Sequence, residues 1–143
     1  MIGDTNSLKA EYFDVWFHCP VVPEPLPDAF GILTPCNPFG RKIGAGENAS
    51  RLEALQRLLD DRGIRHFPVD GGTRDRSHLE PGFGVVGIDQ DAVRALGVQF
   101  EQDAIFWVEG DRVTLLACNS SAARPAGKWS ERCVDCVRRA PES

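Results

Sequence analysis

The clearest pattern in the chain is helical and covers residues 47–63, ENASRLEALQRLLDDRG. Charged side chains surround one side of this segment, while the apolar face comprises Leu52, Leu55, Leu58 and Leu59. Gly63 follows the last of these leucines and can adopt the left-handed conformation in which many helices end. The sequence therefore predicts a helix packed on a core and ending at this glycine.

Two further helices are predicted from spacing and capping residues. In residues 89–100, Asp89 can cap the first turn, and the apolar stripe comprises Ala92, Val93, Leu96 and Phe100. Residues 7–19 begin with Ser7, a capping residue, and place apolar side chains at roughly helical spacing. The proline-rich segment 20–28 favours an extended connector because proline has no backbone donor.

Short apolar runs bounded by turn residues predict the strands, which cover residues 30–35, 64–69 and 83–88 and a hairpin over 104–118. Pro68 cannot donate to a ladder, so the second of these strands is expected at a sheet edge. Gly84 and Gly87 indicate that something packs closely against the third strand. Residues 70–82 have no apolar periodicity and are predicted as a polar loop.

The order strand, helix, strand, strand, helix, strand, strand predicts an α/β fold of the α+β sandwich type. Two right-handed crossovers around an antiparallel pair generate a ferredoxin-like βαββαβ core, with helices on one face of the sheet. A C-terminal hairpin strand and an N-terminal helix are expected as additions to this core. A different α+β order, or an extra N-terminal strand closing the sheet edge, are the alternatives.

The predicted elements form one domain, residues 1–118. Residues 119–143 are rich in small and polar residues at their start and basic near their end. They are expected to form a loosely ordered polar tail outside the core.

Composition narrows the classes of function. The chain has 143 residues and a formal net charge of −5, which does not favour nucleic-acid binding, since that depends on clustered Lys and Arg. No secretory signal or membrane-spanning run is evident, so a cytoplasmic protein without membrane contact is expected. Five cysteines at irregular spacing do not resemble a secreted disulfide framework. Oligomeric state is left open.

The predicted topology brings dispersed polar residues together. If the strand over 83–88 lies antiparallel beside the strand over 30–35, the end of one meets the start of the other. Asn37 then approaches His78 and Glu80. The first helix and the last core strand begin at this same end of the sheet. Those two elements add Asn48, Arg51 and Gln102.

The loop before the first helix predicts a binding site. Helix N-termini attract anions, and Arg41, Lys42 and Arg51 would strengthen this attraction. Asn37, Asn48 and Gln102 would orient a small anionic ligand or a peptide end. The alternative is a surface loop in which Asn48 only caps the first helical turn.

Other features of the sequence suggest different functions. His78 and Glu80 are two apart and could share the acid-base work of a hydrolase- or transferase-type enzyme, or could simply be solvated. Cys133 and Cys136 form a single C-x-x-C, a weak zinc pattern, so no cofactor is predicted. Phe106 and Trp107 could suggest a stacking surface for bases. They are expected on opposite faces of one strand, so only one of them could face a ligand. An exposed sheet edge or the basic tail would instead suit a protein–protein interaction module.

Several of these residues resemble one family. The matching stretches are Thr34-Pro35-Cys36-Asn37-Pro38, Glu47-Asn48 with Arg51-Leu52, Glu80 before an apolar strand, and Phe100 to Phe106. Together they resemble the bacterial proteins grouped as domain-of-unknown-function family 3293, over about Tyr12 to Cys118. The resemblance implies a bacterial cytoplasmic domain and marks Asn37, Asn48, Glu80 and Gln102 as matching polar positions. It implies no activity, and it does not extend to Cys133 and Cys136.

Overall fold

A computed structural model describes residues 10–38 and 41–135 of the chain, which form a mixed α/β structure around one antiparallel sheet. The strand order is β1-β3-β4-β2-β5-β6-β7. The strands are β1 (Trp16–His18), β2 (Ala29–Leu33), β3 (Arg65–Gly72), β4 (Leu79–Val86), β5 (Ala104–Glu109), β6 (Arg112–Ala117) and β7 (Ala123–Lys128). The helices are η2 (Ala10–Asp14), α1 (Ala45–Asp61), α2 (Gln90–Gln99) and α3 (Trp129–Arg132).

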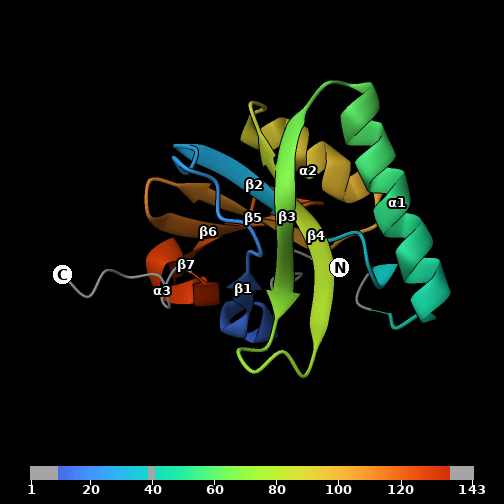
Figure 1. Ribbon diagram of the computed structural model, residues 1–143, viewed down its shortest axis with the longest axis horizontal. Coiled ribbons are helices and arrows are strands. Elements are labelled where there is room, and N and C mark those ends of the chain that lie inside the picture. The colour runs from blue at the N-terminus through green and yellow to red at the C-terminus, as the bar shows by residue number, and fades with distance from the viewer. Residues whose placement is uncertain (1–9, 39–40, 136–143) are drawn as a thin grey trace.

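The two longer helices, α1 and α2, cover one face of the sheet (Figure 1). Leu55 and Leu59 of α1 and Val93 of α2 are fully buried there, against strand residues that include Leu33, Val85, Ile105 and Trp107. Apolar side chains at helical spacing thus meet the strand positions that face the same way. This interface forms one of two hydrophobic clusters.

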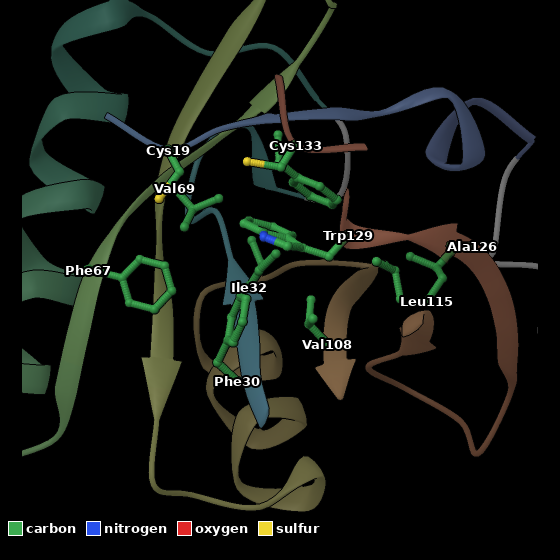
Figure 2. Packing of buried hydrophobic residues seen from close by; sticks show 12 residues of the cluster. Cys19, Phe30, Ile32, Phe67, Val69, Val108, Leu115, Ala126, Trp129 and Cys133 are labelled. Atoms are coloured by element: carbon green, nitrogen blue, oxygen red, sulfur yellow. The ribbon is translucent and has the colours of Figure 1, made fainter. Parts of the chain in front are cut away.

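The second cluster lies inside the curve of the sheet, on the face away from α1 and α2. The sheet curls until β1 approaches the segment after β7, where Phe17 and Cys133 form an isolated parallel bridge. Trp129 fills the gap, stacked on Phe17 at 5.5 Å between ring centroids and edge-on to Phe30 at 5.2 Å. Figure 2 shows Trp129 among Ile32, Val108 and Leu115, at the centre of this inner cluster.

Several predictions from the pattern are confirmed. β2 and β4 pair antiparallel, with Ile32 opposite Gly84. Asp89 caps α2 by accepting a hydrogen bond from the Ala92 backbone at 2.9 Å. A side chain at Gly84 would collide with the ring of Phe67, so this glycine does mark a close approach.

Phe106 and Trp107 lie on opposite faces of β5, as predicted. Phe106 packs against the inner cluster, whereas Trp107 belongs to the cluster beneath the helices. Gly87 behaves differently from Gly84, because nothing packs on it and it has a φ of 89° instead.

The helix predicted over residues 7–19 is wrong for residues 10–19, which the structure describes. Residues 7–9 lie outside the described part of the chain. Residues Ala10–Asp14 form only a short 3-10 turn, and Trp16–His18 form β1. Val15 and Phe17 alternate with Trp16 and pack into the inner cluster, so the period that decides the structure is two rather than 3.6. This is the extra N-terminal strand that the sequence left open as an alternative.

The edge position predicted for β3 needs correction. β3 lies between β1 and β4, but β1 pairs only with residues Asp70 to Gly72. Pro68 lies beyond this short pairing, where its missing donor costs no ladder hydrogen bond to β1. The predicted polar loop over 70–82 is also shorter, because both strands of the hairpin continue into it.

The prediction that residues 119–143 lie outside the core is wrong for the described part of that segment. β7 pairs with β6, and α3 follows it directly. Trp129 is 2% exposed and Cys133 is fully buried. Small and polar residues misled the prediction because β7 is an edge strand that buries only Ala126.

Candidate functional site

Asn37 is the centre of a hydrogen-bond network where β2 ends. Its backbone N–H donates to Asn48 Oδ1 at 2.9 Å, and its Nδ2 donates to Glu80 Oε2 at 2.9 Å. Its Oδ1 accepts from Asn48 Nδ2 at 3.0 Å and from the Ile43 N–H at 3.2 Å. With a φ of 50°, Asn37 takes the left-handed conformation that asparagine tolerates better than most residues. The network ties β2, α1 and β4 together.

Arg51 fastens the same turn from α1. Its Nε donates to the Pro35 carbonyl at 2.6 Å, Nη2 donates to the Phe100 carbonyl, and Nη1 meets Glu101 Oε1 at 3.2 Å. Its side chain is 22% exposed. The guanidinium is therefore committed to the turn and to the end of α2, and not to an external anion.

Gln102 also supports the turn and is nine-tenths buried. Its Nε2 donates to the carbonyls of Cys36 and Phe100, both at 3.1 Å. Five polar residues thus meet at one end of the central strands, as the topology predicted: Asn37, Asn48, Arg51, Glu80 and Gln102. Their hydrogen bonds show an architectural role that sequence alone did not separate from binding.

A cavity of about 410 Å³ opens beside these residues, on the inner face of the curled sheet. We call it the inner cavity. Apolar side chains of the inner cluster form its floor: Val15, Phe17, Ile32, Phe106 and Leu115. Its polar walls comprise Tyr12, Asp14, Thr34, Asn37, Lys42, Thr73, His78, Glu80, Gln102 and Asp103. An apolar floor with a few polar groups is typical of small-molecule sites.

Charge around the inner cavity is predominantly negative. Asp14, Glu80 and Asp103 line it, against Lys42 and the titratable His78. Asp103 Oδ2 accepts a hydrogen bond from the Tyr12 hydroxyl at 3.0 Å. Arg41, predicted as an anion ligand, is exposed and is not among the lining residues.

His78 and Glu80 are neighbours on the cavity wall. His78 Nε2 lies 3.4 Å from Glu80 Oε2, with side-chain exposures of 52% and 29%. The β3–β4 turn positions the histidine, since the His78 N–H donates to Thr73 Oγ1 at 3.1 Å and the Thr73 N–H donates to the His78 carbonyl at 2.9 Å. The pair can therefore face a bound molecule while remaining partly hydrated.

Cys36 is unsuited to act as a nucleophile. Its side chain is 2% exposed, and its Sγ donates to the Pro81 carbonyl at 3.7 Å. Burial, reinforced by the nearby Glu80 carboxylate, raises the pKa of the Cys36 thiol to about 11. The group is thus a protonated thiol at neutral pH.

The zinc pattern gains no support within residues 10–38 and 41–135. Cys133 is buried in the inner cluster, and Cys136 lies outside the described residues. Among the described His, Cys, Asp and Glu side chains, no group of three or more is arranged to hold a metal ion.

In the same part of the chain, no helix is long and apolar enough to cross a membrane.

Sequence reasoning missed much of the inner cavity. Tyr12 and Asp14 belong to a segment predicted as helix, and Thr73 to a segment predicted as loop. Asp103 adjoins the predicted Gln102 and could have been found from that position. The apolar floor carried no separate signal, because its residues also look like ordinary core.

A family model described as Protein of unknown function (DUF3293) matches residues 33–105, half of the chain. The chain belongs to this family. The DUF3293 match contains Asn37, Asn48, Glu80 and Gln102, but it is narrower than the resemblance expected over Tyr12 to Cys118. No curated protein and no solved structure matches the chain.

Replacing Asn37 by glycine tests the architectural role of the network. Glycine accepts a φ of 50° without strain, so Asn37→Gly removes the side-chain hydrogen bonds and leaves the turn conformation accessible. We expect the free energy of unfolding to fall by about 2–3 kcal/mol in urea denaturation. Arg76→Gly is the matched control, because Arg76 is exposed and has a φ of 68°. Equal losses in the two variants would contradict the role of the Asn37 side chain.

Cys36 also predicts a loss of stability in alkali. Below about pH 9 the thiol is protonated in both folded and unfolded chains, but between about pH 9 and 11 only the unfolded chain ionises. The raised pKa therefore contributes stability that is lost as pH rises through this range, about 1 kcal/mol by pH 10. Urea denaturation at about pH 8 and pH 10 should show a smaller loss for Cys36→Ser. Cys118, whose pKa burial raises to about 12, is present in both proteins. Parallel losses would refute the assignment.

Proposed function

We propose that this DUF3293 protein binds a small organic molecule, or the end of a peptide, in the inner cavity. The observation that carries the proposal is the cavity itself, whose volume lies in the range of natural ligand sites. It combines an apolar floor with polar walls from several chain segments. A ligand with an apolar body and a polar end would match both surfaces.

The anionic form of the predicted ligand has weaker support than the binding site itself. Arg51 is engaged by the turn, and Arg41 does not line the inner cavity. Lys42 remains, opposite three carboxylates. The charge on the walls thus favours a ligand that is not a simple anion.

We also propose that the central part of the sheet, with α1 and α2, is a ferredoxin-like βαββαβ unit. The order β3-β4-β2-β5 within the sheet and the placement of both helices on one face support this. β1, β6, β7 and α3 would then be additions that curl the sheet and create the inner cavity. The binding site would belong to the additions as much as to the unit.

Filling the inner cavity tests the binding proposal. Ala104 is small and lines the cavity, so Ala104→Phe should occupy its space, whereas Ala123→Phe places the same ring on the exposed edge strand. In a fragment screen followed by ¹⁵N–¹H correlation spectra, we expect hits to shift amide resonances of Thr34, Gly71 and Thr73. Ala104→Phe should weaken these hits at least about tenfold. Hits that bind Ala104→Phe as tightly as the wild-type protein would contradict the site.

An enzyme of the hydrolase or transferase type is the second candidate, and the placement of His78 beside Glu80 on the cavity wall favours it. With Glu80 near Nε2, His78 could take a proton from an attacking water at its other ring nitrogen. Glu80 would orient the ring and stabilise the imidazolium. Asn37 would in turn hold the carboxylate.

Matched histidine variants test the enzyme candidate. His66 lies 3.5 Å from Asp60 in a similar pair but is not among the residues lining the inner cavity. If His78 is a general base, hydrolysis of p-nitrophenyl esters should fall at least about a hundredfold in His78→Gln and remain unchanged in His66→Gln. Equal rates in both variants and the wild type would remove the candidate.

The interaction module has less support. Among described residues, the large exposed apolar side chains are Val21 and Val98. They lie far apart in sequence, in the proline-rich connector and in α2, and no other large apolar side chain in this set is exposed. Single exposed apolar residues are normal on protein surfaces.

A further inference from the structure

The ligand of the inner cavity can be narrowed to a chemical class. We infer that the cavity takes a protonated amine attached to an apolar group, with the ammonium held between Gln102 and Glu80. This inference rests on the proposed function and specifies the ligand for the same site.

Gln102 supplies the first acceptor. The side chain is 9% exposed, and its two amide hydrogens are used on the Cys36 and Phe100 carbonyls. A flipped amide would bring Oε1 against both carbonyl oxygens, so the orientation is fixed by these partners. Oε1 has no donor among the described residues, and Gln102 lines the inner cavity. An acceptor without a protein partner, on a residue that lines the cavity, indicates a site for a ligand that donates.

Glu80 supplies the second acceptor, and with it a negative charge. Its Oε2 accepts from Asn37 Nδ2 and lies near His78 Nε2, whereas Oε1 has no partner among the described residues. Asn37 and Cys36 are consecutive, and they hold Glu80 and Gln102 respectively. Both acceptors are therefore fixed to the same turn, at the same wall of the inner cavity.

A cation with several N–H donors fits this wall better than the alternatives. Asp14 and Asp103 add to the negative potential, and Lys42 is the lysine among the residues that line the cavity. An anion would face the carboxylates that line the cavity, whereas a neutral hydroxyl would gain less from the Glu80 charge than a cation does. A metal ion is disfavoured, because the described His, Cys, Asp and Glu residues form no group of three suited to one.

The apolar floor indicates that the rest of the ligand, beyond its ammonium group, is apolar. Phe17, Ile32 and Phe106 lie beneath the polar wall and present hydrocarbon and aromatic surface. A free ammonium ion or a highly polar polyamine would leave this surface in contact with water. An arylalkyl or alkyl amine, or the amino terminus of a peptide with an apolar first residue, would cover it.

Three compounds of the same shape separate charge from size. Phenethylamine, 2-phenylethanol and phenylacetate would be titrated into the wild-type protein at pH 7, and affinity read from the amide resonances of Thr34, Gly71 and Thr73. We expect phenethylamine to bind at least about tenfold more tightly than the other two. Its affinity should fall with added salt, because the attraction is electrostatic.

Glutamate variants test the role of the carboxylate. Glu80→Gln keeps an oxygen that can accept from Asn37 but removes the charge, so the preference for phenethylamine should shrink to within about threefold of the alcohol. Glu53→Gln on the exposed side of α1 is the control and should keep the full preference. A preference that persists unchanged in Glu80→Gln would overturn the assignment of the ammonium to Glu80.

The wild-type comparison remains decisive even if Glu80→Gln does not fold. Equal or tighter binding of phenylacetate or 2-phenylethanol would overturn the amine inference and leave the proposed binding function standing. Failure of all three compounds to bind would also overturn the amine inference. The proposed function fails separately, if the wider fragment screen finds no compound whose binding Ala104→Phe weakens.

Discussion

The packing of Phe17 against Trp129 is the interaction on which the rest of the structure depends. Middle strands such as β2 are apolar on both faces, since Phe30 and Ile32 point one way and Leu33 the other. Helices α1 and α2 cover the face that carries Leu33. The other face is buried because the sheet curls and brings β1 to the segment after β7, where Phe17 packs on Trp129. This closure produces both the inner cluster and the cavity at its end.

The polar residues that stabilise the turn after β2 also line the proposed binding site. Asn37 holds the turn after β2, and through the same hydrogen bonds it fixes Glu80 and, through the adjoining Cys36, Gln102. Donors in this network are directed at protein oxygens, and Glu80 and Gln102 also line the cavity. A site that offers acceptors and negative charge is a consequence of how the turn is stabilised.

Two parts of the chain build the site, and they differ in their relation to the DUF3293 family. Residues 33–105 match the family and supply the polar wall with Asn37, Glu80 and Gln102. Much of the floor comes from β1 and β6, with Phe17 and Leu115, outside that match. Most of the polar wall thus belongs to the matched region, whereas the shape of the cavity depends on elements that complete the curl.

Sequence alone predicted the features whose signals are local, the leucine face of α1 and the Asp89 cap, and also the antiparallel pairing of β2 with β4 that places Asn37 beside Glu80. Capping, periodicity and right-handed crossovers act over a few residues or a single connection, so they can be read from the pattern. It did not determine β1, β7 or the burial of Trp129, because short edge strands acquire their stability from distant partners. The inner cavity required the tertiary structure, since its floor alone comes from segments one hundred residues apart in the chain, such as Val15 and Leu115.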